Sequence, residues 1–332
     1  MRAIAVHDGS QVAEARRYAV TIAHALEFGE TDAGRVAIVA TELASNLIKH
    51  GKGGTLLVGD YHDGTGSGVE CIALDRGPGI GDIEESLRDG HSTAGSAGNG
   101  LGAIQRIANT TEIYTRVGSG TAILARLNPS QPSCAKAPMP TTWGAVSVPI
   151  AGEDICGDVW LVKPQADGFL VVVADGLGHG PLAAEAGEAA VLVCLAEPAP
   201  PLDVMIARMH AALRPTRGAA VAVAEVDSKT GTVNFVGIGN VAGALITSTA
   251  TRRMVSHNGI IGHVTNRVQV FTYGFTGAPL VVLCSDGVGT SWNLNDYPGL
   301  SHRHPSLIAG VLYRDFNRGR DDATIVVARG HI

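Results

Sequence analysis

Residues 128–142 divide the chain into two parts and constrain its fold more than any other segment. This stretch shows neither helical nor strand periodicity, and it carries four prolines: Pro129, Pro132, Pro138 and Pro140. Proline has no N–H donor, so such a stretch is typical of a stiff, extended linker. A chain of 332 residues is also long for a single core. We predict domains at residues 1–127 and 143–332, joined by this linker.

The composition narrows the class of protein and its surroundings. A hydrophobic content of 45% indicates packed domains rather than disorder. A net charge of −6 without a basic run argues against nucleic acid as a partner. No apolar stretch approaches the roughly 20 residues that span a bilayer, so no membrane partner is expected. The five cysteines are scattered and never form Cys-x-x-Cys, which indicates a reducing, cytoplasmic environment.

The first domain begins with two predicted helices and a pair of strands. Residues 11–28 have the spacing of an amphipathic helix, and Thr31-Asp32 is typical of an N-cap for a second helix that ends near residue 50. Glu42, Asn46 and Lys49 share one face of this second helix, which by itself is most often a solvated face. Residues 54–60 and 69–74 alternate like paired strands.

Two glycine-rich segments follow these strands. Asp75 leads into Gly77-Pro78-Gly79, which predicts a turn. The small-residue loop at residues 91–102 runs into a helix and offers backbone N–H groups to a phosphate. It lacks the Gly-x₄-Gly-Lys-Ser/Thr pattern of a P-loop, and no adjacent strand precedes it as in a Rossmann fold.

Three motifs occur in order: Glu42-x-x-x-Asn46, Asp75-x-Gly77-x-Gly79 and Gly98-x-Gly100-x-Gly102. Together they resemble the GHKL ATPases, and within them the anti-sigma-factor type of serine protein kinase. The resemblance implies a GHKL (Bergerat) α/β sandwich that binds ATP with Mg²⁺. It implies that Asn46 holds Mg²⁺, that Asp75 accepts the adenine amino group, and that Glu42 is the general base toward the acceptor hydroxyl.

The same resemblance implies a lid over the phosphates between Ser92 and Gly102. The implied nucleotide-binding set is Asn46, Lys49, Asp75, Gly77, Gly79, Ser92, Thr93, Gly98, Asn99, Gly100, Leu101 and Gly102. Phosphoryl transfer depends mainly on positioning and charge neutralisation, which suits this set.

In the second domain an apolar run at residues 171–174 ends in Asp175-Gly176, and residues 281–284 lead to Asp286-Gly287 in the same way. Each pattern alone is a common hairpin signal. Two of them, with further acidic residues nearby, indicate a metal site lined by carboxylates. Antiparallel strands are predicted at residues 219–227, 232–238, 242–248, 268–273 and 280–284. With helices predicted at residues 181–196 and 201–213, they suggest a four-layer sandwich.

The acidic motifs are Gly157-Asp158, Asp175-Gly176, Ser285-Asp286-Gly287 and Asp321-Asp322-x-Thr324. They resemble the metal-dependent serine/threonine phosphatases (PPM), specifically the SpoIIE type. The resemblance implies an α/β (α+β) chain whose second domain is an α/β/β/α sandwich with two Mn²⁺ or Mg²⁺ ions. The implied ligands are Asp158, Asp175, the Gly176 carbonyl, Asp286 and Asp321, with Asp175 as the catalytic bridging carboxylate.

Several neighbouring residues stay open at this point. Asp322 is either a ligand or a hydrogen-bonding support for Asp321, and Asp321 is favoured as the ligand. His179 either orients substrate or caps the following helix, and Asn240 is a further contact candidate. Glu153 and Asp154 are acids of the kind that is usually solvated. The group that binds the substrate phosphate is not identified, because the Arg-bearing N-terminal motif of the eukaryotic relatives is missing.

These motifs lead to a functional hypothesis with one alternative. By resemblance, the first domain phosphorylates serine or threonine on a protein, and the second removes such phosphates. The implied partners are STAS-type anti-sigma antagonists or stressosome proteins, and kinases of this type often form homodimers. The alternative is a phosphatase whose first domain only binds nucleotide, or sequesters a sigma factor or switch protein.

Overall fold

The computed structural model describes residues 1–63, 66–84, 100–130, 141–248, 250–265 and 268–330. Within this part the chain forms two compact units that do not follow the order of the sequence. Residues 1–138 and 302–314 form the first unit, and residues 139–301 and 315–332 form the second. The first unit therefore includes a segment that lies far beyond the linker. The domains predicted from the sequence, residues 1–127 and 143–332, therefore stay a prediction.

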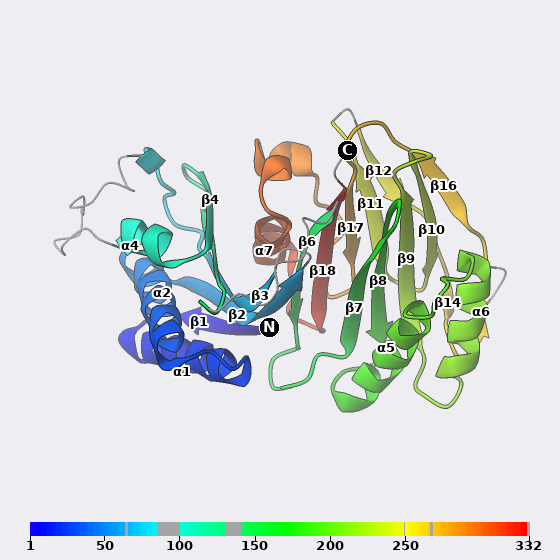
Figure 1. Cartoon of the computed structure of the whole chain (residues 1–332), viewed down its shortest axis with the longest axis horizontal. Helices are drawn as coiled ribbons and strands as arrows, with labels where there is room; N and C mark the ends of the chain where they lie inside the picture. Colours follow the sequence, from blue (N-terminus) through cyan, green and yellow to red (C-terminus); the bar gives the residue numbers. More distant parts are fainter. Residues whose placement is uncertain (64–65, 85–99, 131–140, 249, 266–267, 331–332) are drawn as a thin grey trace. The chain divides into compact units, whose positions relative to one another are not determined.

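The first unit is built on an antiparallel sheet with strand order β1-β2-β3-β5-β4. The two N-terminal helices lie side by side over one face of it (Figure 1). A buried core fills the space between these helices and the sheet. Alternate residues of β3 contribute to it: Val69, Cys71 and Ala73 point toward the helices. The elements are β1 (Arg2–Val6), α1 (Gly9–Ala25), α2 (Glu30–Lys49), β2 (Gly54–Asp63), β3 (Gly66–Leu74), α4 (Gly100–Ile107), β4 (Thr110–Arg116), β5 (Gly120–Leu127) and α7 (Pro305–Phe316).

The second unit packs two sheets face to face. One has the order β13-β10-β9-β8-β7 with β16 added to β10, and the other β12-β11-β17-β18-β6. Alternate residues of β8 serve two cores: Val171 and Val173 face the other sheet, whereas Leu170 and Val172 pack against α5 and α6. Figure 1 shows these two helices beside this sheet. The predicted mixed α/β class with a two-sheet sandwich is confirmed.

The strands of the second unit are β6 (Thr141–Val148), β7 (Asp158–Gln165), β8 (Gly168–Gly176), β9 (Ala219–Asp227), β10 (Thr232–Ile238), β11 (Ala242–Ile246), β12 (Thr251–Met254), β13 (Ser256–His257), β14 (Gly259–Ile260), β15 (Val264–Thr265), β16 (Phe271–Gly274), β17 (Leu280–Cys284) and β18 (Ala323–Gly330). The helices are α5 (Pro181–Cys194) and α6 (Leu202–Leu213), with short 3₁₀ turns at Leu294–Asp296 and Leu300–His302. None of the described helices is long and apolar enough to cross a membrane.

One predicted helix start is wrong. The second helix begins at Glu30, and its N-cap is Gly29, without a side-chain cap, rather than Thr31-Asp32. The Asp32 carboxylate instead accepts hydrogen bonds from Ser130 and Arg35, so it is not available to cap the helix. The predicted strand at residues 268–273 is also displaced, because the structure has β16 at Phe271–Gly274.

Candidate functional site

Two of the candidate residues of the first unit, Glu42 and Asn46, lie beside the start of α4. Glu42 and Asn46 lie one turn apart on α2, and Gly100 begins α4. A Cβ at Gly100 would lie 3.3 Å from Asn46 Oδ1 and 3.4 Å from Glu42 Oε2. Asn46 Nδ2 is buried without a hydrogen-bond partner, which normally costs free energy. An unpaired buried amide beside a helix start fits a site for a phosphate and its metal ion.

Asp75 is held by the backbone at the end of β3. Its Oδ1 accepts the N–H groups of Gly77 at 2.8 Å and Thr121 at 3.1 Å. Gly79 follows with φ +75°, and a Cβ there would lie 2.4 Å from the carbonyl oxygen of Arg116. Only glycine fits this close approach. The predicted turn is therefore present, and it fixes the orientation of the Asp75 carboxylate.

The remaining nucleotide candidates are less completely placed. Gly100, Leu101 and Gly102 form the first turn of α4, and Lys49 is exposed at the last residue of α2. Ser92, Thr93, Gly98 and Asn99, with most of the predicted lid, lie outside the described residues. The roles of all these residues in binding ATP stay predictions.

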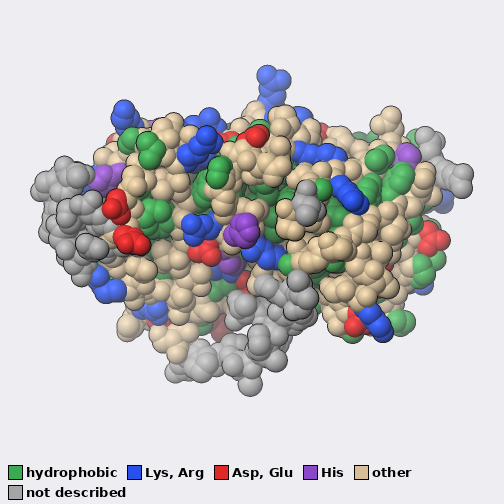
Figure 2. All heavy atoms as spheres, turned by 90° about the horizontal axis from the view of Figure 1, so that it is seen from above, with side chains coloured by type: hydrophobic (Ala, Val, Ile, Leu, Met, Phe, Trp, Pro, Cys, Tyr) green, Lys and Arg blue, Asp and Glu red, His purple; other side chains and the backbone are tan. Residues whose placement is uncertain are grey.

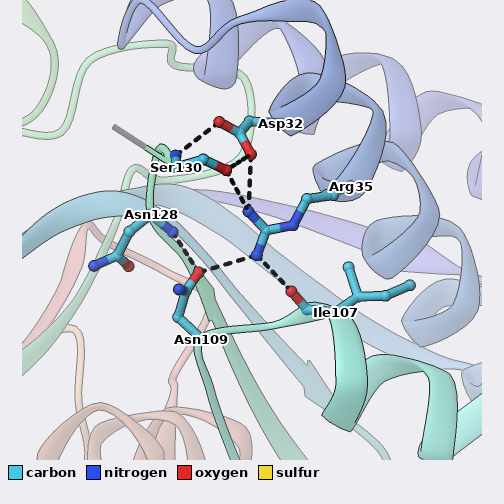
Figure 3. Close-up of polar contacts among 6 residues, drawn as sticks. All are labelled: Asp32, Arg35, Ile107, Asn109, Asn128 and Ser130. Carbon is cyan, nitrogen blue, oxygen red and sulfur yellow. Dashed lines mark hydrogen bonds and ion pairs between the residues drawn. The ribbon is translucent and has the colours of Figure 1, made fainter. Parts of the chain in front are cut away.

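A polar network joins α2 to the end of α4 and to the start of the linker (Figure 3). Arg35 donates to the Ile107 carbonyl at 2.7 Å and to Asp32 at 2.8 Å. Ser130 donates to Asp32 through its hydroxyl and its N–H, and these bonds, with that from Arg35, lower the pKa of Asp32 to about 2. Arg35 thus ties the helix of Glu42 and Asn46 to the far end of α4.

The predicted metal ligands of the second unit come from neighbouring strand ends. Asp158 and Asp175 are directly paired across β7 and β8, whereas Asp286 follows β17 and Asp321 precedes β18. Strand β8 runs through Asp175 to Gly176 and leads into a helix, so the hairpin alternative is wrong there. A Cβ at Gly176 would lie 2.0 Å from the Ala183 carbonyl oxygen, which shows how closely α5 packs on this strand end.

The pKa values of three of these carboxyl groups are raised. Burial and the charges of Asp158 and Asp286 raise the pKa of Asp175 to about 8. Burial also raises the pKa of Asp158 to about 7, against hydrogen bonds from Ser285 and Thr324. The pKa of Asp286 is raised by burial and by Asp321. Four acidic groups therefore share one edge without a cation among them, which disfavours their charged forms.

The donor chemistry of this edge fits hard divalent cations. Carboxylate oxygens are the ligands that Mg²⁺ and Mn²⁺ prefer. Asp158 Oδ2 is buried without a hydrogen-bond partner, as expected of an atom that meets an ion. As the side chains stand, no three His, Cys, Asp or Glu residues of the described chain are arranged to hold a metal.

The structure shows the contacts of the residues near this edge whose roles the sequence left undecided. Asp322 accepts the N–H groups of Ile150 and Gly157, both at 2.6 Å, so both its oxygens serve the backbone and Asp321 is left as the better ligand candidate. Asn240 donates to Asp286, and His179 Nδ1 lies 2.7 Å from Glu153 Oε1. His179 thus faces an acid rather than capping α5, whose N-cap is Gly180. Asp154 gains no role.

The sequence interpretation missed three supporting residues. Ser285 and Thr324 are buried, and their side chains lower the pKa of Asp158 against the effect of burial. Arg318 donates to the Asp286 carbonyl at 3.0 Å, which places a cation beside the carboxylates. The Ser-Asp-Gly and Asp-Asp-x-Thr spacings contained a signal for the hydroxyls. No sequence motif around Arg318 indicated a role for it, because its contact with Asp286 depends on the fold of the loop between α7 and β18.

Comparisons with known proteins agree with this division into sites. Residues 6–127 match the histidine kinase-like ATPase domain family, and residues 165–331 match stage II sporulation protein E (SpoIIE). The serine/threonine-protein kinase RsbT of Bacillus subtilis (strain 168) is 33% identical over 114 residues, which is 34% of this chain and 86% of RsbT.

Two further similar proteins are a phosphatase and a chain from a stressosome structure. The phosphoserine phosphatase RsbX of Bacillus subtilis (strain 168) is 29% identical over 90 residues, 27% of this chain and 45% of RsbX. That match covers less than half of RsbX. A chain from a structure of the bacterial stressosome, described as a modular system adapted to control secondary messenger signaling, is 26% identical with a TM-score of 0.53. It covers 57% of this chain and 99% of its own length.

The two families match successive parts of the chain, and each match covers most of one site described above; Asp158 lies before the SpoIIE match. The SpoIIE match spans Asp175, Asp286 and Asp321, and the ATPase match spans Glu42, Asn46 and Asp75. The chain therefore belongs to the SpoIIE family of PPM-type phosphatases and carries, before that domain, a histidine kinase-like ATPase domain homologous to RsbT.

Proposed function

We propose that the chain is a bifunctional partner-switching regulator. Its first domain transfers phosphate from ATP to a serine or threonine of a protein, and its second hydrolyses such phosphoesters. The observation that carries the kinase half is the similarity to RsbT over 86% of that kinase, with Glu42 beside Gly100 and Asn46. We infer STAS-type antagonists or stressosome proteins as substrates, supported by RsbT and the stressosome structure.

In the first domain, the Glu42 carboxylate would accept the proton of the attacking hydroxyl, and Asn46 would hold Mg²⁺ on the phosphates of ATP. Asp75 would accept the adenine amino group, since backbone N–H groups already hold its carboxylate in one orientation. The start of α4 would offer N–H groups to the phosphates. These residues position the reactants and neutralise charge, which is the main demand of phosphoryl transfer.

In the second domain, Asp158, Asp175, Asp286, Asp321 and the Gly176 carbonyl would hold two Mn²⁺ or Mg²⁺ ions. Such ions supply Lewis-acid neutralisation of a phosphate and lower the pKa of water. Asn240 orients Asp286, and Asp322 fixes the loop of Asp321 by its bonds to Ile150 and Gly157. Arg318 lies beside Asp286 and is our candidate for binding the substrate phosphate.

Phosphate transfer in a background without phosphatase activity tests the kinase half. The full chain with Asp175→Asn is incubated with γ-labelled ATP and a purified STAS-domain protein, so that product is not hydrolysed. We expect labelling of the STAS protein that is lost with Glu42→Gln. It should persist with Glu30→Gln, an exposed glutamate in the first turn of the same helix. Tight ATP binding without any transfer would favour the phosphatase-only alternative.

Release of phosphate tests the other half. The unaltered chain with Mn²⁺ should dephosphorylate a phosphoserine-bearing STAS protein, and Asp175→Asn should not. Hydrolysis of a small phosphate ester with none of the phosphoprotein would contradict the proposed substrate class while leaving the reaction in place.

A further inference from the structure

Helix α4, which begins beside the proposed phosphate site, depends on its surroundings for its position. It has only eight residues, Gly100–Ile107, and glycine occupies two of its first three positions. Helices this short are marginal in water, and glycine lowers helix stability further because it loses more backbone freedom on folding. Contacts with the rest of the first unit therefore determine where the helix and its first N–H groups lie.

Apolar packing attaches the middle of α4 to the first unit. Ile104 is fully buried in the core that α1 and α2 form over the sheet, and Leu101 and Ile107 pack against the same core. The hydrophobic effect is non-directional, whereas a hydrogen bond depends steeply on distance and angle. Polar contacts at the ends of the helix therefore fix its position along its own axis more strictly than the core does.

Arg35 of α2 supplies such a contact at the end of α4 (Figure 3). Its Nη2 donates at 2.7 Å to the carbonyl of Ile107, the last residue of the helix. The charge of the guanidinium is favoured there, because the carbonyl end of a helix is the negative end of its dipole. Arg35 thus caps α4 at the end opposite Gly100.

Arg35 is itself held by acceptors on both of its terminal nitrogens. Nη1 donates to Asp32 at 2.8 Å and to the Ser130 hydroxyl at 3.3 Å, and Nη2 also donates to Asn109 at 3.4 Å. Ser130 holds Asp32 in turn, through its hydroxyl at 2.6 Å and its N–H at 2.8 Å. A planar guanidinium with acceptors on both sides has one favoured orientation, so the cap on α4 is rigid.

The contacts at the two ends of α4 come from one face of α2. Arg35, Glu42 and Asn46 fall at i, i+7 and i+11, which places them on the same side of that helix. Ile107 meets Arg35, whereas Gly100 lies beside Glu42 and Asn46. A single helix of the first unit therefore holds the end of α4 and carries the candidate residues that lie beside its start.

We propose that Arg35 is a positioning residue of the nucleotide site, which caps α4 and so holds the first turn of that helix beside Asn46. The inference rests on the proposed function, because it takes Asn46 as the Mg²⁺ ligand and the start of α4 as the phosphate-binding end. Without the cap, α4 occupies its binding position for only part of the time. The apparent affinity for a nucleotide triphosphate falls by the same fraction.

Calorimetric titration of the full chain with AMP-PNP and Mg²⁺ tests the inference, because it gives affinity and stoichiometry separately. Arg35→Met removes the donors, and Arg35→Lys keeps a charged donor. Ser130→Ala is a milder change, which removes one hydroxyl from the network. Arg17→Met, at an exposed arginine of α1, is the matched control. Asp75→Asn shows whether the titration reports the proposed adenine site.

We expect Arg35→Met to raise the dissociation constant of AMP-PNP by about five- to tenfold at unchanged stoichiometry, as for a binding-competent fraction of about a fifth to a tenth. Arg35→Lys and Ser130→Ala should each raise it by about two- to threefold, and Arg17→Met should not change it. A merely structural role of Arg35 would lower the stoichiometry, because part of the chain would be unfolded, and would leave the dissociation constant unchanged.

The inference is overturned if Arg35→Met binds AMP-PNP as tightly as the unaltered chain, or if Arg17→Met loses as much affinity. Should Arg35→Met not fold, unchanged affinity in both Arg35→Lys and Ser130→Ala overturns it. A different result would remove the proposed nucleotide function itself, and the inference with it: no binding of AMP-PNP to the unaltered chain, or normal binding to Asp75→Asn.

Discussion

The molecule contains two clusters of charged side chains. One is buried and combines an arginine with two acids, and we call it the balanced cluster; the other is partly buried and purely acidic, and we call it the unbalanced cluster. In the first unit Arg126 pairs with Asp63 and Glu70 and donates to Ser306, so each of its three nitrogens has an acceptor. In the second unit Asp158 and Asp175 share one edge with Asp286 and Asp321, and Asp158 Oδ2 has no hydrogen-bond partner. The balanced cluster holds elements together, whereas the unbalanced one is suited to bind cations.

The pKa directions express the same difference. Burial opposes the charge of Arg126, yet Glu70 and Asp63 raise its pKa above the ordinary value, so the folded state keeps the ion. For Asp175, burial and like charges act in the same direction and raise the pKa to about 8. A buried charge is therefore structural where its neighbours are of opposite sign, and a site for chemistry where they are not.

Removing a carboxylate from the unbalanced cluster should have the largest effect. Asp175→Asn should lower Mn²⁺-dependent hydrolysis of p-nitrophenyl phosphate by at least about 10³-fold, because several kcal/mol of metal-ion catalysis are lost. Steady-state rates over a Mn²⁺ titration measure this. Asp167→Asn, in the exposed turn before β8, is the matched control. Unchanged activity in Asp175→Asn would show that this acid only ends a strand.

Breaking the balanced cluster should instead act on stability. Arg126→Met leaves Asp63 and Glu70 buried without their partner, so we expect a loss of about 3–5 kcal/mol in the free energy of unfolding. Urea unfolding of the full chain measures the loss. Adding Asp63→Asn and Glu70→Gln should recover part of it, since no uncompensated charge then remains buried. A triple variant as unstable as Arg126→Met would contradict the charge-balance argument.

Added cations should distinguish the two clusters directly. Mn²⁺ at about 100 times its dissociation constant should stabilise the unaltered chain by about 2.7 kcal/mol, because it binds the folded state and relieves repulsion. Thermal unfolding with and without EDTA measures this shift in Tm. Asp158→Asn should lose most of the shift, whereas Arg126→Met should keep it. Equal shifts in both variants would place the cations elsewhere.

The smallest expected effect concerns the contact of α7 with the balanced cluster. Ser306→Ala removes the acceptor of one Arg126 hydrogen bond at a fully buried position. We expect a loss of about 1–2 kcal/mol in the free energy of unfolding, well below that of Arg126→Met. The same urea titrations measure it. An effect as large as that of Arg126→Met would mean that the Ser306 contact, not the ion pairs, carries the stability of the cluster.

The surface fits the regulator proposed above. On the face drawn in Figure 2, Lys and Arg side chains are scattered among acidic and apolar ones rather than gathered into a stripe. With a net charge of −6, such a mixed surface is more typical of protein recognition than of phosphate-backbone binding.

Several local structures were predictable because short-range patterns determine them. The strands at β9, β10 and β17 match the predicted segments residue for residue, since alternation with Gly-bearing turns is read within ten residues. The start of α2 and the short β16 were not predicted correctly. Long-range contacts determine both elements. Asp32 accepts a hydrogen bond from Ser130, and β16 pairs with the distant β10.

The sequence by itself determined the two families, the order of their motifs and the acids at the strand ends, because each is a local pattern of residue types. Only the tertiary structure decided that Asp322 serves the backbone, that Ser285 and Thr324 lower the pKa of Asp158, and that residues 302–314 belong to the first unit. These facts depend on contacts between residues far apart in the chain. Their free energies depend on burial and geometry, which no local pattern contains.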